Sequence, residues 1–138
     1  MMPNNFRQSA EMEWHHVDAA GAVLGRLATR VAGLLIGKHR LDWQQNTVAP
    51  VYVVVTNTNS VILTGKKEEQ KLYHHYTGYP GGIKKRTPAA VRQRDSRRMV
   101  RLAVEGMLPK NSLRPVRLGH LKLYTGATHP HEAQVKQL

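Results

Sequence analysis

Cysteine is absent from this chain, and acidic residues are scarce, with nine Asp and Glu against 21 Lys and Arg. The lack of thiols excludes disulfides and thiolate metal centres, and it is compatible with a reducing compartment. No apolar run approaches the roughly 18 residues that a membrane helix needs, so we predict no membrane partner. Residues 1–13 lack the apolar centre of a signal peptide, which argues against secretion.

The chain nevertheless has enough apolar sequence for one core. Its 138 residues suit a single domain, and a hydrophobic content of 41% argues against global disorder. Apolar residues recur every three or four positions over residues 24–35, which predicts a helix with one buried stripe that stops near Gly37. Residues 51–55 are continuously apolar and mostly β-branched, as in a strand buried on both faces of a parallel sheet. With candidate strands at residues 14–17 and 61–64, the pattern predicts a βαβ unit.

The second half of the chain predicts short helices and one more strand. Thr87 before Pro88 is a typical helix start, and Ser96 can cap a further helix that ends at Pro109. Residues 112–118 suit a short helical turn, and residues 121–124 suit a last strand. The segment 73–82, YHHYTGYPGG, is too rich in Gly and Pro for a helix, and we interpret it as an ordered loop.

Positive charge is concentrated in residues 84–122. This segment holds twelve Lys and Arg but only two acids, Asp95 and Glu105, and so carries +10 of the formal net charge of +12. Internal pairing cannot neutralise such an excess, which favours polyanion binding over a merely solvated surface. The Tyr and His residues of segment 73–82 lie between Lys71 and Lys84, where rings can stack on bases while cations hold phosphates. The alternative interpretation of this segment is a packed loop whose tyrosines cap the core.

Sites of other chemistry find no support in the sequence. Residues 21–26 have three residues between their glycines and then Arg, whereas a phosphate loop needs four and then Lys. Adjacent histidines, as in His15-His16 and His74-His75, point to opposite faces of a strand, so we predict no metal site. The acids lack the paired spacing of general acid–base catalysis, and no serine lies in a nucleophile elbow. We therefore expect no catalytic residue, no cofactor, no small-molecule substrate and no enzymatic activity.

Several short blocks, in order, resemble the ribosomal protein L-thirteen family of the large subunit. They are LGRLAT at 24–29, GKH at 37–39, VTNTNSVILTGKK at 55–67, YHHYTGYPGG at 73–82, GMLPKN at 106–111, LKLYTG at 121–126 and HPHEAQ at 129–134. The resemblance covers about residues 14–134. It implies a three-layer α/β/α domain with a small, mainly parallel four-stranded sheet. We expect a flexible tail at 1–13, the domain at 14–126 and a polar extension at 127–138.

The resemblance also implies a function and a set of contacts. It implies a structural, non-catalytic protein that binds large-subunit rRNA, supports subunit assembly and translation, and adjoins neighbouring large-subunit proteins. The rRNA contacts that it implies are Lys38, His39, Lys66, Lys67, His75, Thr77, Gly78, Tyr79, Gly81, Gly82, Lys110 and Lys122. The charge and the aromatic residues add Lys71, Tyr76, Lys84, Lys85, Arg86, Arg114 and Arg117.

Two features depart from the usual bacterial members of that family. The acidic pattern expected before the central strand is missing, since residues 44–51 read QQNTVAPV, and residues 111–118 look more like mitochondrial members. We therefore favour a mitochondrial ribosome over a bacterial or plastid one. A free-standing regulator that binds messenger RNA through the same surface is the alternative function.

Overall fold

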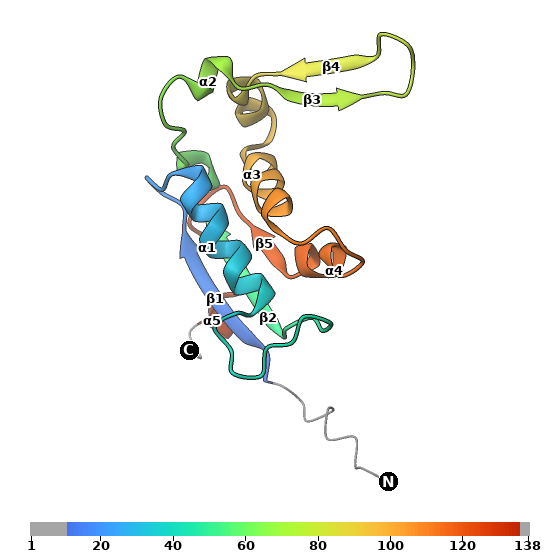
Figure 1. The fold of residues 1–138 in the computed structure, drawn as a ribbon. Helices are drawn as coiled ribbons and strands as arrows, with labels where there is room; N and C mark the ends of the chain where they lie inside the picture. Colours follow the sequence, from blue (N-terminus) through green and yellow to red (C-terminus); the bar gives the residue numbers. More distant parts are fainter. Residues whose placement is uncertain (1–10, 136–138) are drawn as a thin grey trace.

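A three-stranded parallel sheet forms the centre of the computed structural model, which describes residues 11–135 (Figure 1). Strand β2 (Val51–Thr56) lies between β1 (Glu13–Asp18) and β5 (Leu121–Leu123). The register pairs β1 with β2 over its full length, and three residues of β5 pair with 53–55. Because β2 is the central strand, its valines are fully buried on both faces of the sheet, as the sequence predicted.

Helix α1 (Leu24–Ile36) covers one face of this sheet with the stripe that its spacing predicted. Leu27, Ala28, Val31 and Leu35 are buried in the same core as the inward valines of β2. The helix ends at Gly37, whose φ of +83° is in the left-handed region. A Cβ at this glycine would lie 2.5 Å from the Cβ of Ala49, so both the turn and the space require glycine.

Helix α3 (Pro88–Met107) packs beside α1 and is interrupted at Asp95, whose backbone is extended (φ −162°, ψ 104°). Thr87 caps the first part as predicted, since its hydroxyl accepts from the amide of Ala90. The second cap is not Ser96, as we predicted, but Asp95, whose Oδ1 accepts from the amide of Arg97 at 3.1 Å. Ser96 is instead buried and shares a 3.1 Å hydrogen bond with Thr58. Helix α4 (Arg114–Gly119) then leads into β5.

Segment 73–82 belongs to a β-hairpin and not to a loop as predicted. Strands β3 (Tyr73–Tyr76) and β4 (Ile83–Arg86) pair antiparallel and project away from the rest of the molecule (Figure 1). The glycines form the turn between the strands, since Gly78 and Gly81 have positive φ and the amide of Thr77 donates to the carbonyl of Gly82. The sequence signal was obscured because the connecting turn is long and the strands carry few apolar residues.

The predicted α/β class and mainly parallel sheet are confirmed, but the sheet has three strands and not four. Residues 61–64 form only an isolated bridge, between Ile62 and Val23, next to the 3₁₀ turn η2 (Thr58–Ser60). The short helix α2 (Lys67–Gln70) follows them. Within residues 11–135, no helix is long and apolar enough to cross a membrane.

The third layer of the fold is small. Helices α1 and α3 share one core on one face of the sheet, while the opposite face carries a stack of aromatic rings. Trp14 stacks on Tyr52 at 4.5 Å between ring centroids, and His131 stacks on Trp14 at 5.1 Å. Behind the sheet, the one-turn helix α5 (Glu132–Val135) completes this cover (Figure 1). Residues 1–10 of the predicted tail and 136–138 of the predicted extension lie outside the described residues, and the domain boundaries stay predictions.

Candidate nucleic-acid interface

A cationic groove separates the β3–β4 hairpin from helix α3. It encloses about 780 Å³, and four of its lining residues are Lys84 and Arg86 of the hairpin and Arg94 and Arg98 of the helix. Asp95 is the one acid in its lining, and its carboxylate is taken up by Arg97 at 3.0 Å. Those hydrogen bonds and the adjacent charge outweigh partial burial and lower the pKa of Asp95. Asp95 is therefore ionised at neutral pH and its charge is offset by Arg97, so the four cations leave the groove positive.

The apolar floor and wall of this groove give the cations a fixed frame. Val91 of α3 is buried beneath it, and the Tyr73 ring forms part of the hairpin side. Burial raises the pKa of the Tyr73 hydroxyl, and the ammonium of Lys71 lies 5.1 Å from the centre of this ring. A groove with charged walls and an apolar floor can accept a sugar–phosphate chain with its bases or sugars against the floor.

The hairpin presents its polar side chains on both faces. Cross-strand partners share a face, so Tyr73, His75, Lys84 and Arg86 lie on one side. His74, Tyr76, Ile83 and Lys85 lie on the other side. All eight except Tyr73 are exposed, and the exposed fractions of Tyr76 and Tyr79 are 62% and 76%. Exposed rings beside unpaired cations are what stacking on nucleotides requires.

Most of the predicted contact residues near the hairpin are free of ion pairs. Among residues 11–135, none of the lysines takes part in a salt bridge, and neither do Arg86, Arg94, Arg98 and Arg101. A second, shallower hollow of about 540 Å³ lies around α2 and is lined by Lys66, Lys67 and Lys71. Thr77, Gly78, Gly81 and Gly82 lie in the hairpin turn, so the structure gathers these predicted residues on the hairpin and beside α2.

Not all predicted cations share this surface. Arg117 is only 2% exposed, so our expectation of an accessible charge there is wrong. One of its terminal nitrogens donates to the carbonyl of Thr47 at 3.4 Å, and its Nε has no partner among the described residues. The sequence could not reveal this burial because α4 is short and its arginine spacing resembles that of an exposed turn. Lys122 lies beside Val54 on the sheet face opposite α1.

Two further predicted contacts, Arg114 and His39, lie beside acidic side chains, whereas Lys38 and Lys110 do not pair with any acid among residues 11–135. Lys110 is exposed after α3, and Arg114 of α4 is half-buried with Glu105 at 3.9 Å. At the C-terminal end of α1, Lys38 is exposed, but the Nε2 of His39 lies 3.1 Å from the carboxylate of Glu13. Lys38 and His39 follow the C-terminal end of α1, which lies far from the hairpin (Figure 1). The predicted contacts therefore form separate patches, of which the hairpin and groove are the largest.

Comparison with known proteins places this architecture in one family. The family model described as Ribosomal protein L13 matches residues 12–130, which is most of the chain. This chain belongs to the ribosomal protein L13 family. The family resemblance inferred from short sequence blocks is thereby confirmed.

Individual members of the L13 family are similar over nearly their whole length. The large ribosomal subunit protein uL13 of Thermus thermophilus is 46% identical over 127 residues, which is 92% of this chain and 91% of that protein. The protein of the same name in Thermotoga petrophila is 45% identical over 92% of this chain and 85% of its own length. That of Legionella pneumophila is 44% identical over 88% and 85%. These relatives are bacterial and give no support to the mitochondrial preference.

The structure adds site residues that our sequence analysis did not select for this L13 family member. Arg94 and Arg98 line the groove, but charge alone does not separate them from the other arginines of segment 84–122. Their spacing of four residues was the available signal, because such residues lie on one side of a helix. By contrast, Arg92 is structural, since it donates to the carbonyls of Asn59 and Val61 and pairs with Glu68.

Proposed function

We propose that this chain is a structural constituent of the large ribosomal subunit that binds large-subunit rRNA. The observation that carries the proposal is the groove between the hairpin and α3, where four cations have no internal partner among residues 11–135. Arg guanidinium groups can hold phosphate through two donors, and Lys supplies point charge. Membership of the L13 family and the names of its relatives support the same role.

The mechanism that we propose is neutralisation of converging rRNA phosphates by a rigid cationic surface. Helix α1 packs against α3, and the hairpin, which leads directly into α3, faces that helix across the groove. The proposed contact set is Lys38, His39, Lys66, Lys67, Lys71, His75, Tyr76, Thr77, Gly78, Tyr79, Gly81, Gly82, Lys84, Lys85, Arg86, Lys110, Arg114 and Lys122, with Arg94 and Arg98 added. Phosphate contacts of this kind position RNA, and the exposed tyrosines can stack on unpaired bases.

The proposed role includes no catalytic step, and it includes neighbouring large-subunit proteins as partners. It supports subunit assembly and translation at the ribosome. A bacterial-type ribosome fits the relatives named above, while the mitochondrial ribosome suggested by residues 111–118 stays a prediction.

Sedimentation of the native particle tests the proposal. We expect the chain to co-sediment with large subunits through a sucrose gradient after a high-salt wash that strips loosely bound factors. Recovery only in the light fractions, together with messenger RNA, would contradict the ribosomal role and favour the free-standing regulator.

A further inference from the structure

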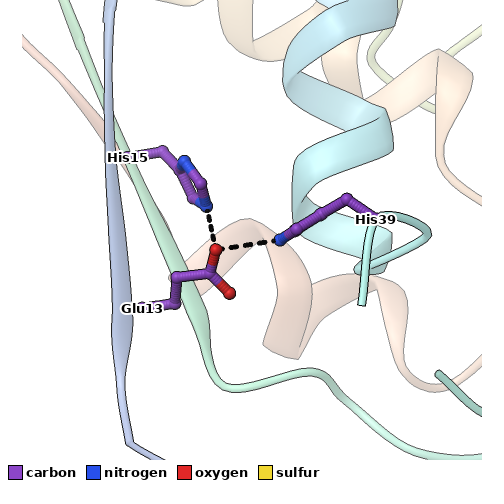
Figure 2. A group of neighbouring side chains, drawn as sticks. All are labelled: Glu13, His15 and His39. Atoms are coloured by element: carbon purple, nitrogen blue, oxygen red, sulfur yellow. Dashed lines mark hydrogen bonds and ion pairs between the residues drawn. The ribbon is translucent and has the colours of Figure 1, made fainter. Parts of the chain in front are cut away.

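At the end of α1 away from the hairpin (Figure 1), the ring nitrogens of His15 and His39 both point at the carboxylate of Glu13 (Figure 2). The Oε1 of Glu13 lies 2.7 Å from the Nε2 of His15 and 3.1 Å from the Nε2 of His39. All three atoms lie within 4.8 Å of one another. Glu13 and His15 share a face of β1 because they are two residues apart in a strand. The turn at Gly37 brings His39 back over them.

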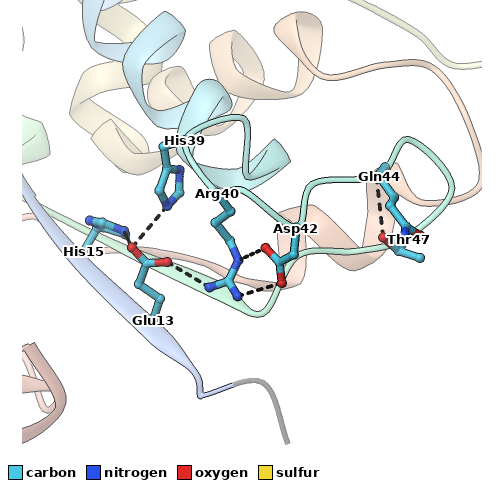
Figure 3. A network of polar contacts seen from close by, with 7 residues as sticks. All are labelled: Glu13, His15, His39, Arg40, Asp42, Gln44 and Thr47. Atoms are coloured by element: carbon cyan, nitrogen blue, oxygen red, sulfur yellow. Dashed lines mark hydrogen bonds and ion pairs between the residues drawn. The ribbon is translucent and has the colours of Figure 1, made fainter. Parts of the chain in front are cut away.

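The charges around these donors favour a cation. Arg40 donates to the second oxygen of Glu13 at 3.0 Å, and its other nitrogens are held by Asp42 at 2.9 and 3.0 Å (Figure 3). Asp42 therefore offsets Arg40, and the carboxylate of Glu13 leaves one negative charge beside two imidazoles.

The surroundings also hold the donors in place while leaving them accessible. The side chains of Glu13, His15 and His39 are 23%, 27% and 32% exposed, so an ion can enter. The His15 and His39 rings meet edge to face at 5.2 Å between centroids. Arg40 orients the carboxylate from outside the donor set, as outer hydrogen-bond partners do at metal sites.

We propose that Glu13, His15 and His39 bind a divalent transition-metal ion of the Zn²⁺ type, with water in the fourth position. Two imidazoles and one carboxylate are a known ligand set for Zn²⁺, with bonds of about 2.0–2.2 Å. Tetrahedral ligands at that distance lie about 3.3 Å apart. The two separations from Glu13, 2.7 and 3.1 Å, are shorter than this by about 0.6 and 0.2 Å, and the two histidine nitrogens lie within 4.8 Å of each other. Each neutral imidazole then carries its proton on Nδ1. The ion joins β1 to the segment after α1, and of its three ligands only His39 also belongs to the proposed RNA contacts.

Our sequence analysis missed this arrangement because it considered histidines as adjacent pairs. His15 and His16 do lie on opposite faces, since His16 donates to or accepts from Thr56 across the other side of the sheet. The usable signal was Glu-x-His in a strand, followed by a distant His after a glycine stop. That signal places two ligands but does not place the third.

Titration of the tag-free, chelator-treated full chain with Zn²⁺, followed by calorimetry, tests the site. We expect one equivalent to bind, and Co²⁺ to give the visible absorption of a tetrahedral centre. Glu13→Gln, His15→Asn and His39→Asn should each lower the affinity at least about tenfold, because even outer partners cost that much when lost. The matched control is the double variant His74→Asn/His75→Asn, which removes two exposed histidines of the hairpin and should bind as the parent does.

The His39→Asn variant decides the outcome, because His39 lies in an exposed turn and its loss leaves the core intact. Zn²⁺ should also raise the thermal midpoint of the parent but not of this variant. The proposal is overturned if the parent binds Zn²⁺ no more tightly than His39→Asn, or if the hairpin double variant loses the affinity instead.

Discussion

At the residue scale, the structure separates arginines that hold the fold from arginines that are free to bind. Arg92 and Arg117 are turned inward toward backbone carbonyls, whereas Arg94 and Arg98 line the groove. All four belong to the same basic segment of the sequence, and their charge alone does not distinguish them. Their separate roles lead to opposite expectations for binding and stability.

Neutralising the groove arginines should weaken RNA binding without unfolding the chain. For Arg94→Gln/Arg98→Gln, we expect the salt dependence of affinity for large-subunit rRNA to fall by about 0.7–0.9 per lost phosphate contact. The matched control is Arg26→Gln/Arg30→Gln, which removes the same charge from the exposed side of α1. Filter binding across a salt series measures both. Equal losses in the two variants would show that net charge, and not the groove, governs binding.

Arg117→Met should keep or improve stability and leave RNA affinity unchanged. Arg117 is 2% exposed and no acid pairs with it among the described residues, so its desolvation is poorly compensated. Replacing a buried ion pair by apolar side chains of similar volume is often neutral or stabilising by about 1–4 kcal/mol, and a buried charge without an ionic partner has less attraction to lose. Chemical denaturation monitored by circular dichroism measures the change. A large loss of stability would mean that this guanidinium has a partner that holds the fold.

At the element scale, the molecule consists of a buried sheet-and-helix core and an exposed hairpin with different tasks. The sequence predicted the core well, because β2 and α1 owe their form to local apolar patterns. It did not predict the hairpin, whose strands are paired by backbone hydrogen bonds and carry Tyr73, His75 and Lys84 in place of an apolar alternation. It also overestimated residues 61–64, since Ile62 is 48% exposed and makes only one bridge. Pairing between strands determines both the hairpin and the fate of residues 61–64, and a local sequence pattern does not reveal which strands pair.

Charge reversal on the hairpin should affect binding alone. We expect Lys84→Glu/Lys85→Glu/Arg86→Glu to weaken RNA binding strongly and to leave the thermal midpoint nearly unchanged, because all three side chains are exposed. The contrasting variant is Val54→Asp, which buries an unpaired charge at a fully buried position and should unfold the domain. Gel-shift assays and thermal melts measure the two effects. Normal rRNA binding by the triple variant would remove the hairpin from the interface.

Acid should lower the stability of the packing around His120 and His131 on the sheet face opposite α1. Burial lowers the pKa of His120 and of His131 below the ordinary value near 6.5, and nearby positive charges contribute. The unfolded chain then takes up protons first, so stability falls as the pH drops through about 6.5 and levels off below the folded pKa values. We expect the thermal midpoint to fall between pH 7.5 and 5.5, and His131→Asn to reduce that fall.

His74→Gln provides the comparison for this pH effect, since His74 is exposed on the hairpin and lies far from the sheet. Its melting profile should follow that of the parent at both pH values. The account is wrong if His131→Asn leaves the slope unchanged or if His74→Gln reduces it equally.

At the scale of the whole molecule, the net charge of +12 is distributed unevenly along the chain. The sequence indicated this excess of positive charge, and the resemblance to the L13 family implied that its partner is large-subunit rRNA. What the sequence could not give was the placement of the charges: the groove exists because α3 breaks at Asp95 and because residues 73–86 fold back as a hairpin. Arg117 lies outside the groove because it is buried, and Lys122 lies outside it because β5 pairs with β2.

Cryo-electron microscopy of the parent large subunit tests the central claim most directly. We predict nucleotide density in the groove between β3–β4 and α3, with phosphates within hydrogen-bond distance of Lys84, Arg86, Arg94 and Arg98. Density that shows these four side chains facing bulk solvent or another polypeptide would contradict it.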